Sequence, residues 1–142
     1  MPKNVIIIGN TPAAATCAIY FKTGNHNVTL LECDSQIPYK TTVVGGLEDP
    51  TKFTENSLEQ CKWLGVNLIR NCGVKEIKKN NKNILVELTN STTYESDIVV
   101  MERDHWKVTD LKDKNIFVMD LKDDSEGIVL AAEGCKVALE MK

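Results

Sequence analysis

Residues 5–20 read VIIIGNTPAAATCAIY, and this stretch decides the fold. Its first four residues are apolar and β-branched and stop at Gly9, a pattern typical of a strand that is buried on both faces. Pro12 follows where a first helical turn would begin, a place that tolerates its missing N–H, and the helix predicted after it ends at Gly24. Apolar residues within 27–32 then predict a second strand. These segments form a β-α-β unit, which indicates a parallel sheet.

The rest of the chain continues this alternation of helices and strands. An apolar stripe before Gly65 predicts a helix over 52–64, and alternating residues around an asparagine-rich turn predict an antiparallel hairpin over 74–88. A third strand at 92–94 would extend the hairpin into a meander. The remaining expected elements are a loop at 33–50, strands at 66–69, 97–101 and 116–119, and a helix at 126–142. We therefore expect one α/β domain over residues 1–142, with a parallel sheet, a small antiparallel β-meander and helices on the faces.

Composition and charge fit an ordinary globular domain of 142 residues, with 42% hydrophobic and 26% charged residues and a formal net charge of −3. The acidic balance argues against a dedicated nucleic-acid binder. No apolar run is long enough to span a membrane, and the N-terminus does not have the pattern of a secretory leader. The five cysteines contain no C-x-x-C pair, so we expect reduced thiols in a cytoplasmic protein. His26, in the stretch GNHN, is expected in an exposed turn.

The turn after the first strand resembles the fingerprint G-x-G-x-x-G/A of dinucleotide-binding Rossmann folds. Gly9 supplies the first position and Ala14 the third, but Thr11 replaces the second glycine, where the backbone must approach a pyrophosphate. Glu32 lies at the end of the second strand, where an acidic residue would bind the ribose hydroxyls. On these residues alone, a nucleotide-binding turn and a generic α/β turn that holds no nucleotide both stay open.

Three stretches of the chain resemble the low-molecular-weight thioredoxin reductases. Residues 5–20 are similar to that family's opening, roughly V-x-I-I-G-S-G-P-A-A-x-T-A-A-I-Y. Residues 115–120, NIFVMD, are similar to its G-x-F-A-A-G-D strand with one residue missing, and residues 126–140, EGIVLAAEGCKVALE, to its Q-A-I-x-x-A-G-x-G-x-x-A-A-L-D helix. The matches stand at opposite ends of the chain in the family's order. The resemblance implies an FAD/NAD(P)-binding, Rossmann-like fold of the α/β class.

The same resemblance implies that a large part of the family's architecture is missing. In the family, an NADPH-binding domain is inserted between strands that correspond to those ending near Met101 and beginning near Phe117. Here only about 15 residues join them, so we expect an FAD-type domain alone, with the inserted domain lost between about 103 and 115. After the first of these strands, the family has A-T-G, and this chain has MER at residues 101–103. The family's flavin-contacting stretch G-G-Q-L has at most a partial counterpart here, in residues 35–37, SQI.

The resemblance also implies which residues would contact a cofactor. Asp120 corresponds to the aspartate that binds the flavin's ribityl chain, and the start of the last helix points at the flavin ring. Glu126 replaces a glutamine there and would repel a reduced flavin, or it only stabilises the first turn of the helix. The candidate cofactor-binding residues are Gly9, Asn10, Thr11, Pro12, Ala13, Glu32, Gln36, Asp120, Gly127 and Ile128.

The departures at Thr11 and residues 101–103 favour a non-catalytic protein derived from a thioredoxin reductase. We expect no catalytic residue, no metal site and no cofactor, with FAD or another adenine nucleotide as the alternative and residual oxidoreductase chemistry as a third. The favoured role is a partner-binding subunit of a cytoplasmic protein or ribonucleoprotein assembly, such as the ribosome. Its candidate contacts are Arg103, His105 and Trp106, where Trp106 is either an interface anchor or a plug of the vacated pocket.

A basic cluster surrounds the predicted hairpin tip. Its members are Lys75, Lys78, Lys79 and Lys82. It is interpreted as a solvated tip, with contact to nucleic-acid phosphates as the alternative.

Overall fold

The computed structural model describes residues 3–33, 39–40, 50–70, 72–80, 83–102, 115–119 and 125–141. The helices are α1 (Pro12–Thr23), α2 (Pro50–Leu64) and α3 (Gly127–Met141). The strands are β1 (Asn4–Ile8), β2 (Asn27–Leu31), β3 (Tyr39–Lys40), β4 (Asn67–Ile69), β5 (Val74–Asn80), β6 (Asn83–Leu88), β7 (Thr93–Ser96), β8 (Ile98–Met101), β9 (Ile116–Val118) and β10 (Ser125–Glu126).

Five parallel strands form the central sheet, in the order β4-β2-β1-β8-β9. β1 lies in the middle, because its apolar residues from Val5 to Ile8 are buried on both faces of the sheet. Ile6 of β1 pairs with Thr29 of β2 on one side and with Val99 of β8 on the other. The strand order therefore reverses between β1 and β8, and their carboxyl ends flank the switch point at which open α/β sheets bind ligands.

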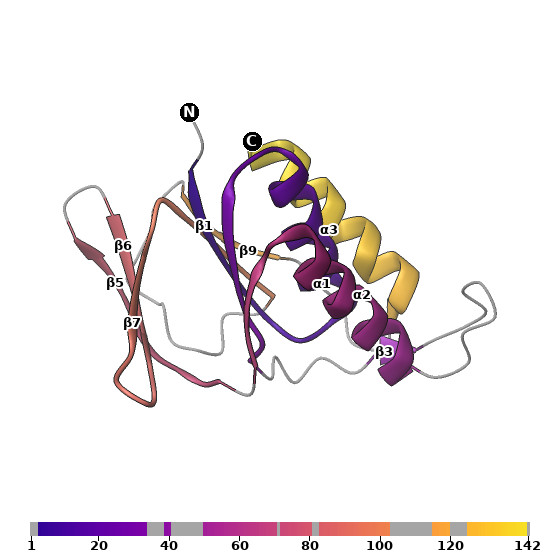
Figure 1. The fold of residues 1–142 in the computed structure, drawn as a ribbon, viewed down its shortest axis with the longest axis horizontal. Coiled ribbons are helices and arrows are strands. Elements are labelled where there is room, and N and C mark those ends of the chain that lie inside the picture. Colours follow the sequence, from indigo (N-terminus) through magenta and orange to yellow (C-terminus); the bar gives the residue numbers. More distant parts are fainter. Residues whose placement is uncertain are drawn as a thin grey trace.

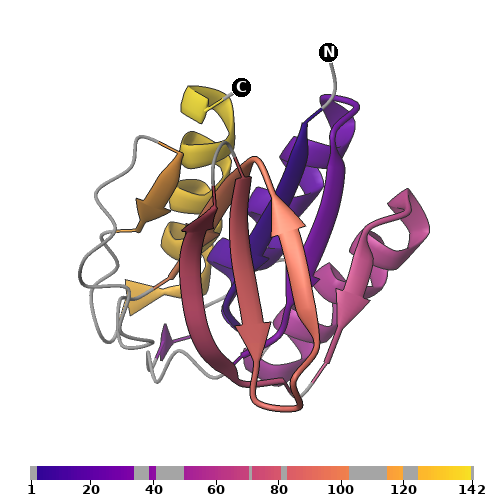
Figure 2. The same ribbon diagram turned by 90° about the vertical axis from the view of Figure 1, so that its left-hand side faces the viewer.

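The sheet is covered on both faces, which gives three layers (Figure 1). Helices α1, α2 and α3 cover one face and share a core with sheet residues such as Ile7, Leu30 and Val100. The antiparallel meander β5-β6-β7 covers the other face and shares a second core with Ile8 and Met101. Figure 2 shows this meander in front of the sheet. The predicted fold class, an α/β fold with a parallel sheet and a small antiparallel meander, is confirmed.

Helices α1 and α3 pack closely because the residues where they meet are small. Ala13, Ala14 and Ala15 are buried on α1. On α3, a Cβ atom added to Gly134 would overlap the carbonyl oxygen of Ala13 and lie 3.0 Å from the amide nitrogen of Cys17. Gly134 belongs to the family-like pattern of the last helix, and the close packing of α1 against α3 explains why a glycine stands there.

Several element boundaries differ from the sequence-based prediction by one or two residues, and the starts of α2 and α3 are two of them. α2 begins at Pro50 instead of residue 52, since proline is well tolerated in a first helical turn. The last helix begins at Gly127, because Glu126 before it pairs with Lys40 in the short parallel ladder of β3 and β10. Strands of two residues show no periodicity, so no sequence pattern predicts this ladder.

The prediction of an exposed turn at His26 is wrong. His26 is only 9% exposed, and its Nδ1 atom accepts a hydrogen bond from the N–H of Lys3 at 3.0 Å. Its ring packs edge-on against Phe21, with the ring centroids 5.9 Å apart. The pairing of β1 with β2 brings Lys3 to this turn, a contact that a local polar stretch cannot reveal.

Candidate functional site

The carboxyl end of β1 leads directly into the N-terminus of α1. Gly9 follows the strand, and its N–H donates to the Leu31 carbonyl of β2 at 3.0 Å. Thr11 is the N-cap of α1, since its hydroxyl oxygen accepts a hydrogen bond from the N–H of Ala13 at 3.2 Å. The Thr11 backbone is extended, with φ −101° and ψ 171°, so this position does not need the conformational freedom of glycine.

Glu102, the residue after β8, places a buried carboxylate at this helix N-terminus. The residue is 1% exposed. Its Oε1 accepts from the N–H of Asn10 at 2.8 Å, and its Oε2 accepts from the N–H groups of Thr11 and Ala14, both at 3.1 Å. The Thr11 hydroxyl donates to the same Oε2. An anion is favourable here, because the first N–H groups of a helix lack intrahelical acceptors and the helix dipole is positive at this end.

The Glu102 side chain also fills the space beside Gly9. A Cβ atom on Gly9 would overlap the Cγ, Cδ and Oε1 atoms of Glu102. In dinucleotide-binding folds, the glycine-rich turn leaves room for a pyrophosphate, and the N–H groups at the helix N-terminus bind it. Here a carboxylate of the chain takes both the room and the donors, so this arrangement does not fit a dinucleotide pyrophosphate. The sequence prediction missed Glu102 as a site residue, although MER in place of A-T-G was the available signal.

Glu32 lies at the same edge of the sheet, one residue beyond β2, and is held by Arg70. The Nη2 and Nε atoms of Arg70 lie 2.9 and 3.1 Å from Glu32 Oε2. Arg70 Nη1 also donates to Oε2 of Glu55 on α2 at 3.0 Å, and the bond to Arg70 lowers the pKa of the Glu55 carboxyl. The bonds to Glu55 and Glu32 in turn raise the pKa of Arg70. The carboxylate predicted to bind ribose hydroxyls therefore already forms an ion pair.

The structure brings part of the predicted site together. Asn10 and Thr11 contribute N–H donors to the turn, Pro12 and Ala13 are buried in the first turn of α1, and Gly127 begins α3 directly after β10. Ile128 follows Gly127 in α3. The predicted residues that lie outside the described part of the chain are Gln36, Arg103, His105, Trp106 and Asp120. For all of these residues, binding of a cofactor or partner stays a prediction.

The predicted basic cluster lies on an exposed strand with mixed charges. Its described members are Lys75, Lys78 and Lys79 of β5, and Lys82 lies outside the described residues. Lys75 Nζ is 3.9 Å from Glu87 Oε2, and Lys78 Nζ is 3.3 Å from Glu76 Oε2. Carboxylates that neutralise neighbouring lysines reduce their attraction for phosphates. The arrangement favours the solvated interpretation, and contact with nucleic acid stays a prediction.

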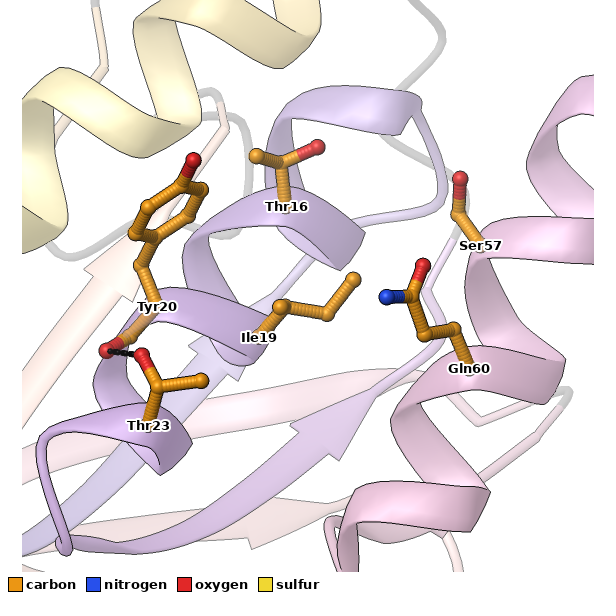
Figure 3. A pocket seen from close by; sticks show the side chains of 6 residues that line it. All are labelled: Thr16, Ile19, Tyr20, Thr23, Ser57 and Gln60. Carbon is orange, nitrogen blue, oxygen red and sulfur yellow. Dashed lines mark hydrogen bonds between the residues drawn. The ribbon is translucent and has the colours of Figure 1, made fainter.

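A groove of about 510 Å³ lies between α1 and α2 on the helical face (Figure 3). Its lining residues are Thr16, Ile19, Tyr20, Thr23, Ser57 and Gln60. The Thr23 hydroxyl donates to the Tyr20 carbonyl at 2.9 Å. Among the described residues, side-chain hydroxyls and an amide line this groove and no lysine, arginine or acidic residue does, so these residues offer no ionic partner to a phosphate or carboxylate.

Within the described ranges, no three His, Cys, Asp or Glu side chains are grouped so that they could hold a metal ion. Nor does any described helix combine the length and the apolar character that crossing a membrane requires.

No protein-family model matches the sequence, and no curated protein matches it. Solved structures are similar to it. Thioredoxin reductase from Lactococcus lactis, in its FR conformation, superposes with a TM-score of 0.59 and 20% identity over 75% of this chain and 38% of that one. Thioredoxin reductase from Streptococcus pyogenes MGAS5005 superposes with a TM-score of 0.58 and 21% identity over 69% of this chain and 34% of that one. CtdE in complex with FAD superposes with a TM-score of 0.56 and 17% identity over 72% of this chain and 38% of that one.

The chain therefore has the fold of part of a thioredoxin reductase, as the sequence resemblance implies. It spans between 34% and 38% of the length of these proteins. At these identities, the similarity concerns the fold alone.

Proposed function

We propose that this chain is a non-catalytic binding protein on a thioredoxin-reductase fold, and that it serves as a partner-binding subunit of a cytoplasmic protein or ribonucleoprotein assembly. The observation that supports this proposal is the position of Glu102. The anion-binding turn of the fold is engaged by a carboxylate of the chain itself. A fold whose helix N-terminus is satisfied internally keeps its structure without a cofactor.

Electrostatics oppose a dinucleotide at this turn. A pyrophosphate bound to the same N–H groups would meet the negative charge of Glu102 in a buried setting, where water screens like charges poorly. Moving the side chain aside would strip a buried carboxylate of its donors, at a cost of about 3–5 kcal/mol if it found no new partner. Both effects lower the affinity of the turn for FAD.

Titration with FAD tests this proposal. We expect the purified chain to show no flavin absorbance and to bind added FAD with a Kd no tighter than about 100 μM. The double variant Thr11→Gly, Glu102→Thr removes the competing charge and restores the residues that the related reductases have at these positions. We expect it to bind FAD roughly 30- to 1,000-fold more tightly, which corresponds to about 2–4 kcal/mol. Calorimetry and quenching of flavin fluorescence measure both affinities.

A matched control removes a carboxylate from the surface instead. Glu95→Thr on the exposed side of β7 should leave FAD binding at the wild-type level. Wild-type chain that purifies with stoichiometric FAD would contradict the proposal. A double variant that folds, as judged by its circular dichroism spectrum, but gains no affinity would show that Glu102 is not what excludes FAD.

Exposed aromatic surface supports the partner-binding part of the proposal. Trp63, near the end of α2, is 87% exposed, and the neighbouring Leu64 is 38% exposed. Tryptophan is enriched among the residues that anchor protein interfaces. Arg103, His105 and Trp106 lie outside the described residues and are the partner contacts expected from the sequence, with Trp106 as either an interface anchor or a plug of the vacated pocket.

Co-sedimentation with ribosomes from a cytoplasmic extract of the source cells tests this part. We expect the chain to move with a large particle at low salt, and Trp63→Ala or Trp106→Ala to weaken this association at least tenfold, as for an interface anchor. Leu139→Ala, on the exposed side of α3, serves as the control. A chain that stays at its own molecular mass under all salt conditions would contradict a role in such an assembly.

The position of Glu32 favours a second candidate function, the binding of FAD or another adenine nucleotide. Glu32 lies where the fold places a ribose-binding acid, although Arg70 pairs with it. This candidate requires saturable binding of ADP that Glu32→Ala abolishes, and the same calorimetry measures it.

A further inference from the structure

Cys33 and Cys72 are 39 positions apart in the sequence, but their Sγ atoms lie 3.0 Å apart. Cys33 follows β2 and Cys72 follows β4, and these strands pair in parallel with Leu31 opposite Ile69. The pairing continues beyond the strands: the Glu32 N–H donates to the Ile69 carbonyl at 2.8 Å, and the Cys72 N–H to the Glu32 carbonyl at 3.2 Å. Two adjoining strand ends therefore hold the two thiols together.

The two thiols have different surroundings. Cys33 is 1% exposed and belongs to the core between the sheet and the meander, whereas Cys72 packs at the edge of this core and is partly exposed. The two sulfurs lie within hydrogen-bond distance, and either thiol can be the donor. With Cys33 as the donor, the bond lowers the pKa of Cys72 and raises the pKa of Cys33. Because the attacking thiolate must reach the small disulfide, the partly exposed Cys72 is suited to attack and the buried Cys33 to resolve the intermediate.

The two fully buried thiols on the helical side of the sheet differ from this pair. Burial raises the pKa of Cys61 to about 11, and its thiol donates to the Ala15 carbonyl at 3.4 Å. Burial also raises the pKa of Cys17. Both side chains are inert packing groups.

We propose that Cys33 and Cys72 form a reversible dithiol–disulfide couple whose substrates are low-molecular-weight disulfides of the glutathione type. The Cys72 thiolate attacks one sulfur of the small disulfide, the S–S bond breaks, and one small thiolate leaves with the electron pair and takes up a proton. Cys33 then gives up its proton and attacks the Cys72 sulfur of the mixed disulfide, which releases the second small thiol. The small disulfide is reduced to two thiols, and the protein is oxidised by two electrons.

Oxidation has a structural consequence at the edge of the sheet. The new bond would link the ends of β2 and β4 beside the Glu32–Arg70 ion pair. It would also close a loop over the 39 positions between the cysteines, which raises the thermal midpoint by constraining the unfolded chain. For a chain of this length, we expect the Tm to rise on the order of 5–10 °C. The couple does not depend on the proposed function, because neither thiol belongs to the turn held by Glu102.

Incubation of the folded wild-type chain with oxidised glutathione tests the couple. We expect two thiols to be lost, a peptide map with Cys33 linked to Cys72, a higher Tm, and full reversal by dithiothreitol. In the Cys33→Ala variant, the glutathionyl adduct on Cys72 should persist, because no second thiol is in place to resolve it. The Cys72→Ala variant should leave Cys33 unmodified on the same time scale, since Cys33 is buried.

Cys135→Ser is the matched control, because Cys135 is a partly exposed cysteine on α3 and lies outside the pair. This variant should form the Cys33–Cys72 bond at the wild-type rate. A wild-type peptide map without that link would overturn the proposal, since it requires no variant to fold. A first adduct on Cys33 in the wild type would overturn the assigned order of attack.

Discussion

At the scale of single residues, Thr11 and Glu102 form a matched pair. The Thr11 hydroxyl accepts from the Ala13 N–H and donates to the Glu102 carboxylate, so it connects the helix cap to the buried anion. A glycine at position 11 would leave that carboxylate with one donor fewer, and an apolar residue at position 102 would leave N–H groups of the turn without this acceptor. The two departures from the reductase pattern therefore act together to stabilise the turn without a ligand.

Gly9 gives a test of how tightly Glu102 fills the turn. We expect Gly9→Ala to lower the free energy of unfolding by about 1–3 kcal/mol, because the added methyl group overlaps the Glu102 side chain. Urea unfolding followed by circular dichroism measures the change. Gly73→Ala serves for comparison and should cost less, since its new Cβ would lie 3.3 Å from the Thr89 side chain, a tight contact that a small shift of that side chain relieves.

A double-mutant cycle separates the overlap from other effects at Gly9. In the Glu102→Ala background, Gly9→Ala should cost at least 0.5 kcal/mol less than in the wild type, roughly the smallest coupling expected for residues in contact. Equal costs in both backgrounds would show that Glu102 does not fill the space beside Gly9.

At the scale of elements, the contact between α1 and α3 holds these two helices together in the helical layer. Glycine in the middle of a helix costs about 0.5–1 kcal/mol relative to alanine, so Gly134 has a cost that its packing must offset. A side chain there would overlap backbone atoms of α1, which cannot move aside as a flexible side chain can. The close approach of two helices is therefore the reason for the glycine.

Replacing Gly134 by alanine tests this reason. Close packing predicts that the free energy of unfolding falls, whereas helix propensity predicts that it rises. We expect Gly134→Ala to lower the free energy of unfolding by about 1–3 kcal/mol, despite the better helix propensity of alanine. Ala132→Gly, at an exposed position of α3, calibrates the propensity effect and should cost up to about 1 kcal/mol. A stabilised Gly134→Ala variant in the same urea titration would contradict the close contact of α1 and α3.

At the scale of the whole molecule, the fold could be predicted because its signals are local. The apolar run of residues 5–8, the turn at Gly9 and the alternation within 74–88 each indicate one element, and their order indicates the sheet. The sites could not be predicted in this way. Glu102 meets Asn10 across 92 positions and Cys33 meets Cys72 across 39, and only the parallel pairing of strands brings such residues together.

The whole chain should lack sustained disulfide reductase activity. Its sequence contains no C-x-x-C pair and no second glycine-rich fingerprint, and Glu102 engages the donors of the first. If the chain binds neither flavin nor a nicotinamide nucleotide, as proposed, electrons from NADPH have no route to a disulfide. We expect NADPH oxidation with thioredoxin or an aromatic disulfide to stay at the level of a heat-denatured sample, while an active thioredoxin reductase serves as the positive control.

The Cys33–Cys72 pair predicts a single round of disulfide reduction, because a dithiol without an electron donor can react only once. An excess of aromatic disulfide should release small thiol in a burst limited by the accessible cysteines of the chain, and the release should then stop. Added NADPH should not restart it, whereas dithiothreitol should. Repeated turnover with NADPH alone would mean that the chain holds a flavin and a nicotinamide nucleotide after all, and the assignment of a non-catalytic role would then be wrong.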